Sequence, residues 1–499
     1  MIYIGIDVGT SGLKAVAVSD DGKLLRTRTA PYPTALAGVQ AEQDASAWLA
    51  AAQIAVPPVV AGEPVAAVAV TSQAPTLVAV DERGSPCGPA LTWVDRRGVA
   101  EAEELADLGA GRNVADPYFG LPKLLWWSRH RHEESRRAAA VLTANGFLVR
   151  HLTGAVTLDE SSAGLFGHGD GSFTPAVAEA GVPLHLLPPV MPCTRLVGSV
   201  TRKAAHETGL PAGTPVAAGG IDAVGAALEA GVLAPGDPPV EMTGFSTVCI
   251  QAAPAGTTIR PLIHTRHCFP GVDLIMGAQV STGAVVEWLR QLTRNPGPPA
   301  DADTTRLDRP GKLLMAACLA GERTPTWNPR ARGAVLGLDL ATTAADLLLA
   351  TFEATALALR DDLDRAAAVI GKHPAIRSVG GGARSDGWLQ VKADVLGCTV
   401  ELPVSGHGAA HGAALLAGLA AGSWHDAEDV RPLTAAVART YEPDAELHRR
   451  YTQRLRLWRD LRDTLAKYDP RISATSGAML PDIVGVPLVA SGPLPGGAA

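Results

Sequence analysis

Cysteine is scarce in this sequence of 499 residues, and the six cysteines are dispersed along it. They are Cys87, Cys193, Cys249, Cys268, Cys318 and Cys398. No CxxC pair or other ligand-like spacing occurs among them, which argues against a zinc site and a disulfide framework. Long apolar runs are also lacking, because Gly and Pro interrupt every stretch before the roughly 18 residues that a membrane helix needs. We therefore expect buried thiols in a reducing compartment and no membrane partner.

Basic clusters are missing as well. Lys and Arg number 43 against 50 Asp and Glu, for a formal net charge of −7. This balance gives no reason to expect nucleic acid or an anionic membrane as a partner. Met1 leads directly into an apolar strand pattern, so we expect no signal peptide and a cytoplasmic protein. The chain is too long for one core, which predicts two large domains.

The sequence is organised around its first residues, where two apolar, β-branched runs flank Gly9-Thr10-Ser11-Gly12. This pattern predicts an antiparallel hairpin with a tight turn. Glycines let backbone N–H groups approach an anion, Thr10 and Ser11 add hydroxyls, and Lys14 adds a cation nearby. Asp7 ends the first strand, where a carboxylate can hold Mg²⁺ through water. The alternative is an ordinary hairpin whose turn is rich in small polar residues.

A second strand–turn–strand pattern surrounds Gly244-Phe245-Ser246-Thr247. Two such hairpins, each opening one half of a long chain, suggest a duplicated, two-lobed ATP-binding protein with a cleft between the lobes. Gly380, Gly381 and Gly382 stand between a predicted strand and a predicted helix, where main chain can approach a flat ring or a phosphate. A flexible loop is the alternative at these glycines.

Three further positions are candidates for a polyol site. The apolar run Val65–Thr71 predicts a central strand, and polar Gln73 follows its end, where ligand crevices form in α/β sheets. Asp222 follows a Gly-Gly turn and begins a predicted helix, as an N-cap or as an exposed general base. Trp93 precedes Asp95 and Arg97, a set that can cover and bond a polyol. A surface salt bridge over a packed Trp is the alternative. Leu158–Ala163 is predicted to be a polar loop.

Ten motifs then occur in one order. They are IGIDVGTSGLKA (4–15), TSQ (71–73), GPALTWVDRR (88–97), LPKLLWW (121–127), LTG (152–154), GGIDAVGAAL (219–228), GERTP (321–325), ARG (331–333), GGGARSDGWLQVKADVLG (380–397) and HGAALLA (411–417). In them the chain resembles the FGGY carbohydrate kinase family, xylulokinase-like members included, of the actin/sugar kinase/Hsp70 ATPase superfamily. The resemblance extends to about residue 460. It implies an α/β fold of two ribonuclease-H-like (actin-like ATPase) domains with a central cleft.

The resemblance also implies a role for each candidate residue. The activity is ATP-dependent phosphorylation of a sugar or polyol hydroxyl, with Asp222 as catalytic base and Asp7 as the carboxylate that organises Mg²⁺. The ATP phosphates would meet Gly9, Thr10, Ser11 and Lys14 in the first turn and Gly244, Ser246 and Thr247 in the second. Gly380, Gly381, Gly382 and Ala383 would flank the adenosine. Gln73, Trp93, Asp95, Arg97 and Asp222 would face the sugar.

The expected domains are residues 1–245, with the sugar site and the first phosphate hairpin, and residues 246–465, with the adenosine site. A mobile tail is expected at 466–499. A ketopentose such as D-xylulose is the first substrate to test, before glycerol, erythritol, gluconate and other ketoses. The oligomeric state is left open, with a homodimer as the assembly to test.

Two other classes of protein stay open on the sequence. Phe245 stands where the family usually has Thr, which suggests a weakly active sugar- or nucleotide-sensing protein. An Hsp70-like chaperone ATPase is disfavoured, because no peptide-binding β domain follows.

Overall fold

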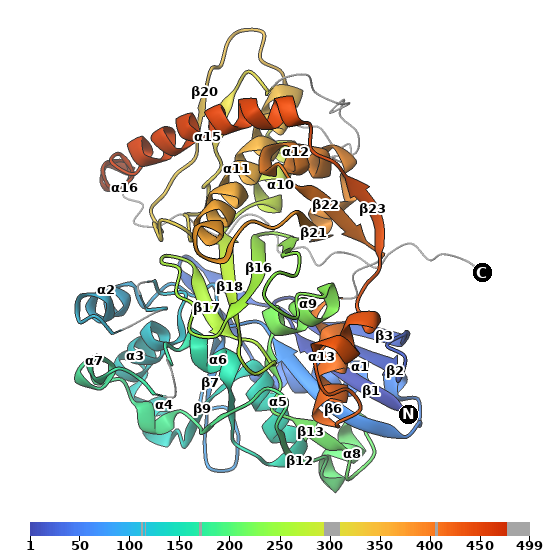
Figure 1. Cartoon of the computed structure of the whole chain (residues 1–499). Helices are drawn as coiled ribbons and strands as arrows, with labels where there is room; N and C mark the ends of the chain where they lie inside the picture. The colour runs from blue at the N-terminus through green and yellow to red at the C-terminus, as the bar shows by residue number, and fades with distance from the viewer. Residues whose placement is uncertain (111–112, 115, 169–171, 294–309, 405–407, 477–499) are drawn as a thin grey trace.

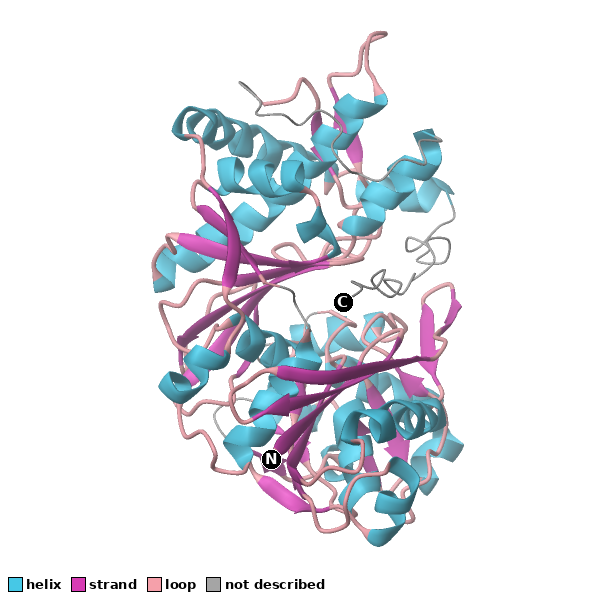
Figure 2. Ribbon diagram, turned by 90° about the vertical axis from the view of Figure 1, so that its right-hand side faces the viewer, coloured by secondary structure: helices cyan, strands magenta, loops and turns pink. Residues whose placement is uncertain are grey.

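Two mixed sheets of seven strands each form the centres of two lobes, with helices on both faces of each sheet (Figure 2). The structure is a computed structural model that describes residues 1–110, 113–114, 116–168, 172–293, 310–404 and 408–476. None of the helices in these ranges is long and apolar enough to cross a membrane.

The first sheet is built on the predicted hairpin. β1 (Ile2–Val8) pairs antiparallel with β2 (Gly12–Ser19), and β6 (Val65–Ser72) lies parallel to β1 on its other side. β1 and β6 are buried on both faces, which explains their nearly continuous apolar sequences. The remaining strands of this sheet are β3 (Leu24–Pro31), β12 (Leu196–Ser199), β13 (Pro215–Ala217) and β14 (Gly220–Ile221).

The second sheet repeats this arrangement. Its strands are β15 (Val240–Thr243), β16 (Thr247–Pro254), β17 (Ile263–Arg266), β18 (Val272–Gln279), β21 (Ala375–Gly380), β22 (Thr399–Pro403) and β23 (Val437–Tyr441). The order β18-β16-β15-β21-β22 matches β3-β2-β1-β6-β13, with two antiparallel pairs followed by two parallel pairs in both. The sheets therefore confirm the two-lobed, duplicated α/β fold that the sequence predicts.

Smaller sheets and the helices complete the two lobes. The short strands are β4 (Ala35–Ala37), β5 (Gln40–Gln43), β7 (Leu77–Val80), β8 (Ala90–Leu91), β9 (Ala140–Thr143), β10 (Leu158–Asp159), β11 (Val190–Met191), β19 (Leu314–Ala316) and β20 (Ala334–Leu336). Helices α1 (Ala45–Val60), α2 (Val99–Asp107), α3 (Gly120–His130), α4 (His132–Arg137), α5 (Ala144–Thr153), α6 (Glu160–Leu165), α7 (Pro175–Glu179), α8 (Arg202–Thr208) and α9 (Asp222–Ala230) precede the second sheet. Helices α10 (Gly283–Thr293), α11 (Ala344–Ile370), α12 (Asp386–Leu396), α13 (Ala409–Ala420) and α14 (Ala427–Val430) come between its strands, and α15 (Ala445–Leu465) and α16 (Asp469–Ser476) come after it (Figure 1).

The segment 158–163 differs from its prediction. It was expected to be a polar loop, but it forms β10 and the start of α6. Asp159 is buried and its Oδ1 accepts hydrogen bonds from the backbone N–H of Ser162 (2.8 Å) and from the Ser161 hydroxyl. Because the polar side chains satisfy one another and cap the helix, this segment can be buried despite its composition.

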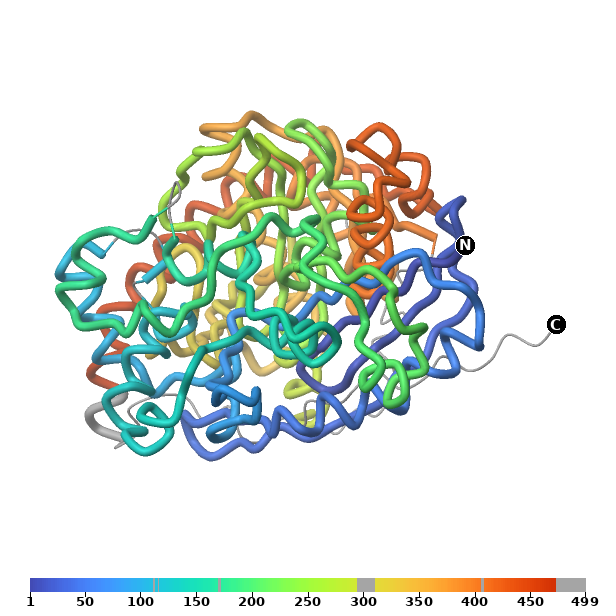
Figure 3. The backbone as a smooth tube through the Cα atoms, turned by 90° about the horizontal axis from the view of Figure 1, so that it is seen from below, coloured from blue at the N-terminus to red at the C-terminus, as the bar shows by residue number. Residues whose placement is uncertain are grey.

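Helix α13 comes late in the chain but packs on the first sheet. A Cβ on Gly5 in β1 would lie 2.0 Å from the Ala410 carbonyl oxygen, and one on Gly412 would lie 1.8 Å from the Gly225 oxygen in α9. Only glycines allow backbones this close. Figures 1 and 3 both show the orange α13 segment beside the blue N-terminal strands.

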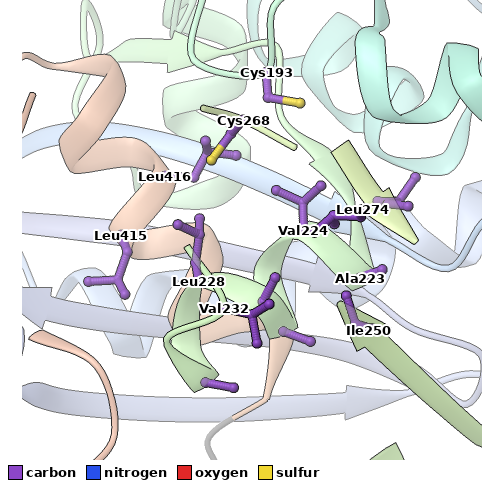
Figure 4. Close-up of a cluster of buried hydrophobic side chains, with 14 of the residues drawn as sticks. Cys193, Ala223, Val224, Leu228, Val232, Ile250, Cys268, Leu274, Leu415 and Leu416 are labelled. Atoms are coloured by element: carbon purple, nitrogen blue, oxygen red, sulfur yellow. The ribbon is translucent and has the colours of Figure 1, made fainter. Parts of the chain in front are cut away.

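One apolar cluster runs between the lobes around α9 and α13. Figure 4 shows Val224 and Leu228 of α9 near Leu415 and Leu416 of α13, with Ile250 and Leu274 of the second sheet beside them. The same cluster includes Tyr3 and Val16 of the first sheet. The two lobes therefore share part of their core.

The expected domain boundaries stay predictions. The second sheet already begins at β15, a few residues before the expected boundary at 245. Of the expected mobile tail, residues 477–499 lie outside the described residues. The preceding α16 is helical, and its Asp469 accepts a hydrogen bond from Asn328 Nδ2 (2.8 Å).

Candidate active site

The carboxyl ends of three neighbouring parallel strands bring three candidate residues together. Asp7 of β1 lies opposite Thr71 of β6, and Ile221 of β14 lies opposite Ser72. Gln73 and Asp222 are the next residues after their strands, so Asp7, Gln73 and Asp222 meet at one edge of the first sheet. This edge is where α/β proteins form ligand crevices.

Asp222 is the first residue of α9, and Ile221 rather than Asp222 occupies the N-cap position. Its Oδ1 accepts a hydrogen bond from the Ala223 N–H (2.9 Å), and the side chain keeps some exposure to solvent. Burial, and secondly the charge of Asp7, raises the pKa of Asp222 to about 7. A carboxyl with this pKa can exchange a proton near neutral pH, as a general base must.

Asp7 provides the second carboxyl of the crevice. Its Oδ1 accepts a hydrogen bond from the Thr71 hydroxyl (3.0 Å). Burial raises the pKa of Asp7 to about 6, while Thr71 and then the charge of Lys14 oppose this shift. Carboxylate oxygens suit Mg²⁺, which protein sites often hold through one or two carboxylates and the substrate phosphates. No group of three or more His, Cys, Asp or Glu that could hold a metal occurs in the described part of the chain.

The first glycine turn is held in place by side chains from elsewhere in the first lobe. The Tyr32 hydroxyl donates to the Gly9 carbonyl (2.6 Å), and Gln43 Nε2 donates to the Thr10 carbonyl (2.7 Å). Trp93 Nε1 donates to the Thr10 hydroxyl oxygen (2.9 Å). The backbone of the turn is thus fixed before any ligand arrives. Ser11 and Lys14 lie at or just after this turn and are partly exposed.

Gln73 lies at the end of β6 and leaves one acceptor unused. Its Nε2 donates to Gln43 Oε1 (2.6 Å), whereas its buried Oε1 has no hydrogen-bond partner among the described residues. A substrate hydroxyl would satisfy this oxygen. Gln43 was missed by the sequence analysis, because its partners Thr10 and Gln73 come from distant segments.

Asp95 and Arg97 form an ion pair that already has protein partners. Asp95 Oδ2 accepts from the Ala41 N–H (2.9 Å) and from Arg97 Nη2 (2.7 Å). Arg97 Nη2 also pairs with Glu42 (2.6 Å), and the guanidinium lies 4.2 Å from the Trp126 ring centre. This resembles the salt bridge over a packed Trp that the sequence left open, with Trp126 in place of Trp93. Direct sugar contacts of Asp95 and Arg97 stay a prediction.

The second glycine turn, between β15 and β16, rests on the start of α10. The Gly244 and Phe245 carbonyls accept hydrogen bonds from the Gly283 N–H (3.2 Å) and the Thr282 N–H (2.9 Å). Phe245 and Ser246 are partly exposed. The Thr247 hydroxyl is buried and shares a hydrogen bond with the Thr243 hydroxyl (2.8 Å). Of the hydroxyls predicted at this turn, Ser246 is the one with an exposed side chain.

The first of the three glycines, Gly380, ends β21, and the other two follow it, next to the second turn. Thr243 is opposite Gly380 in the parallel pair of β15 and β21. Gly380 has φ +89°, and a Cβ there would lie 2.6 Å from the Thr243 carbonyl oxygen. A Cβ on Gly382 would lie 2.6 Å from Thr243 Cγ2. Gly381 through Ala383 begin a short 3₁₀ turn. The predicted adenosine and phosphate residues of the second lobe therefore meet at Thr243.

A buried ion pair lies directly under this meeting point. Lys392 Nζ of α12 pairs with Glu241 Oε1 of β15, and the Thr243 hydroxyl donates to Glu241 Oε2 (2.6 Å). The side chains of Lys392 and Glu241 are only 3% and 1% exposed. Since buried charges are tolerated when paired and hydrogen-bonded, the pair can fix Thr243 and both turns.

Two duplicated lobes with a glycine turn in the first hairpin of each, and carboxyls at the strand ends between them, define a two-domain, actin-like ATPase. Profiles of the FGGY family of carbohydrate kinases match this chain, the N-terminal domain over residues 2–228 and the C-terminal domain over residues 256–421. The chain therefore belongs to the FGGY family of carbohydrate kinases.

Individual relatives agree with this assignment. The chain is 27% identical over 448 residues to a xylulose kinase of Staphylococcus xylosus, covering 83% of this chain and 90% of the relative. It is 31% identical over 430 residues to a glycerol kinase of Trichlorobacter lovleyi, covering 80% of this chain and 82% of the relative. A xylulose kinase structure from Rhodospirillum rubrum is 27% identical, has a TM-score of 0.83, and covers 94% of this chain and 100% of its own.

The protein is accordingly a carbohydrate kinase, with a sugar and ATP as its substrates. This confirms the family, the fold and the enzyme class predicted from the sequence. The roles of the individual site residues stay predictions.

Proposed function

We propose that the protein transfers the γ-phosphoryl group of Mg²⁺·ATP to a hydroxyl of a ketopentose such as D-xylulose. The observation that carries this proposal is the meeting of Asp7, Gln73 and Asp222 at the strand ends, directly beside the first glycine turn. The similarity to relatives named xylulose kinase supports the choice of sugar.

In the proposed reaction Asp222 accepts the proton of the attacking hydroxyl. The Gln73 Oε1 accepts a hydrogen bond from another sugar hydroxyl and orients the ring or chain. Backbone N–H groups of the two glycine turns, with Lys14, bind the phosphates. Phosphoryl transfer depends mainly on such positioning and on stabilising charge on the phosphoryl oxygens. Asp7 would hold Mg²⁺, which neutralises phosphate charge when bound.

A coupled assay of ADP release with ATP and Mg²⁺ tests the proposal across ketopentoses, other ketoses, glycerol, erythritol and gluconate. We expect turnover on D-xylulose or a related ketopentose, lost in Asp222→Ala and retained in Asp426→Ala, a substitution at an exposed helix start. Removing the base should lower kcat by about 10²–10⁴-fold. Chelation of Mg²⁺ should abolish turnover, and its return should restore it.

Full activity in Asp222→Ala would remove Asp222 as the base. Turnover on glycerol alone would show that the substrate is this triol and not a ketopentose, in line with the glycerol kinase relative. ATP binding without turnover on any compound would favour a sensing protein, and Phe245→Thr would then be the next variant to assay.

A further inference from the structure

The GERTP segment of the second lobe, Gly321–Pro325, has no role in the reaction as described so far. It is anchored firmly within its own lobe. The Thr324 N–H donates to the Ala278 carbonyl of β18 (3.1 Å), and the Ala278 N–H donates to the Thr324 hydroxyl oxygen (2.6 Å). The Thr324 hydroxyl also donates to Asp362 Oδ2 in α11 (2.7 Å). Arg323 therefore projects from a rigid support.

Arg323 contacts two aromatic rings of the first lobe. Its guanidinium carbon is 4.6 Å from the ring centre of Trp93 and 4.6 Å from that of Tyr118. Cations are attracted to the faces of aromatic rings, most strongly where water is excluded. The side chain is 3% exposed, so this condition is met.

Within the described chain no other group neutralises Arg323. Its Nε is buried without a hydrogen-bond partner, and no ion pair with a described carboxylate is formed. Arg96 and Asp116, whose charges both act on Arg323, pair with each other (3.6 Å). A buried cation without an anionic partner is unfavourable unless it gains other interactions. Here the two rings supply them.

Each of these rings is bonded to one part of the candidate site. Trp93 Nε1 donates to the Thr10 hydroxyl in the first glycine turn (2.9 Å). The Tyr118 hydroxyl donates to the carbonyl of Ala74 (3.0 Å), the residue after Gln73. The Arg323 guanidinium, which belongs to the second lobe, thus contacts two side chains of the first lobe. One of them bonds the first glycine turn, and the other bonds the backbone next to Gln73.

Trp327, two residues after this segment, adds an apolar contact beside Arg323. Its ring centre lies 4.9 Å from that of Phe119, and its Nε1 donates to the Pro261 carbonyl (2.7 Å). The contact of this segment with the first lobe is therefore apolar as well as cationic.

We propose that Arg323 is a positioning residue of the sugar site, supplied by the second lobe. Its guanidinium holds the rings of Trp93 and Tyr118 in place. These two residues in turn hold Thr10 and the backbone next to Gln73. Because Arg323 reaches the rings only when the lobes are together, sugar affinity depends on lobe contact. This inference rests on the proposed function and assigns the sugar affinity of that site to a residue of the opposite lobe.

The test compares Arg323→Met and Arg323→Lys in the full-length enzyme with the preferred sugar. We expect Arg323→Met to raise KM for the sugar about tenfold, as loss of a buried cation–π contact predicts, with a smaller change in KM for ATP. Arg323→Lys keeps a cation over the rings and should recover part of the loss. Arg360→Met is the matched control, because Arg360 is also buried in the second lobe and bonds Val395 and Thr452. It should lower stability but leave both KM values unchanged.

A double-mutant cycle with Trp93→Leu distinguishes positioning from general loss of structure. If Arg323 acts through the ring, Arg323→Met should add little to the KM of the Trp93→Leu enzyme. Additive effects, or a wild-type sugar KM in Arg323→Lys and Arg323→Met, would overturn the proposal. A rise in KM confined to acidic sugars would also overturn it, since that would indicate that Arg323 binds a substrate carboxylate directly.

Binding is measured separately from turnover, as the shift in the unfolding temperature that each sugar produces without ATP. A wild-type protein that is stabilised by a sugar but never turns it over would contradict the proposed function. Loss of that stabilisation in Arg323→Met, and its partial return in Arg323→Lys, would still support the positioning role. Equal stabilisation of the wild type and both variants would refute it.

Discussion

Asp222 and Asp7 are two carboxyls that share one crevice, and the charge of Asp7 helps to raise the pKa of Asp222 to about 7. Only the unprotonated form of Asp222 can accept a proton, so activity should fall as pH drops below about 7. On the acid side, kcat/KM should fall almost tenfold for each pH unit. It is measured at sugar concentrations below saturation, where kcat/KM reports the pKa of the free enzyme.

The measurement is a kcat/KM profile between pH 5.5 and 8.5. Enzyme held at pH 5.5 and returned to pH 7.5 should regain its full rate, which separates protonation from unfolding. A flat profile across this range would contradict the assignment of Asp222 as the titrating base.

Asp362 is a buried carboxyl away from the crevice, on α11. Burial raises its pKa to about 8, and its Oδ1 has no hydrogen-bond partner among the described residues. Between the unfolded pKa near 4 and the folded pKa near 8, the folded protein holds a proton that the unfolded chain has lost. The stability from this proton is therefore full below pH 4 and is lost as pH rises to about 8.

Asp362→Asn keeps the shape and removes the charge. We expect it to raise Tm at pH 8.5 by about 2–4 °C relative to the wild type and to change Tm less at pH 5.5. Asp107→Asn, at an exposed position in α2, is the control and should leave Tm unchanged at both pH values. A lower Tm for Asp362→Asn at pH 8.5 would show that the ionised carboxylate stabilises the fold.

Sequence patterns located Asp7 and Asp222 because each stands at a strand end next to glycines, a local signal. Gln43 gave no such signal, and the GERTP motif indicated the family but no role for Arg323. Gln43 bonds Thr10 and Gln73, and Arg323 contacts Trp93 and Tyr118, all distant in sequence. Pairings of this kind depend on the tertiary fold, which residue spacing alone does not determine.

At the scale of elements, the end of β15 and the end of β21 are held together through Thr243, above the Glu241–Lys392 pair. Lys392→Met leaves a buried, unpaired carboxylate, which should lower the free energy of unfolding by about 3–5 kcal/mol. Because Thr243 contacts both predicted ATP segments, KM for ATP should rise more than KM for the sugar.

The double variant Glu241→Met/Lys392→Met removes both charges and should regain stability over Lys392→Met, since apolar pairs can replace buried ion pairs. Thermal unfolding and the two KM values provide the comparison. A rise in sugar KM as large as the rise in ATP KM would contradict a local role at the ATP segments.

The elements themselves were predictable where their pattern was local. The Ala- and Leu-rich run from Thr342 to Ile370, with Thr342 or Thr343 as cap and Gly371 as stop, predicts one long helix. The structure has α11 there, at Ala344–Ile370, with a capping box at Thr343. Segment 158–163 was misread because its polar residues are satisfied by one another inside the fold. Composition indicates how polar a segment is but not whether its polar groups find partners.

At the scale of the whole molecule, the apolar cluster around α9 and α13 includes residues of both sheets. We expect the lobes to unfold together, because exposure of this cluster in one lobe removes contacts of the other. Scanning calorimetry should show a single transition with equal calorimetric and van't Hoff enthalpies. Sugar and ATP should move that transition to higher temperature as a unit. Two separate transitions would show that the lobes are thermodynamically independent.

The position of α13 also bears on how the chain is made. Gly5 in the first strand completes its packing against Ala410, which leaves the ribosome some four hundred residues later. A nascent chain that has emerged only as far as the first sheet must keep the face of β1 and β6 uncovered until α13 arrives. Synthesis of this kinase therefore includes a long interval in which an apolar sheet face is open to chaperones, or to aggregation, before the last helices close it.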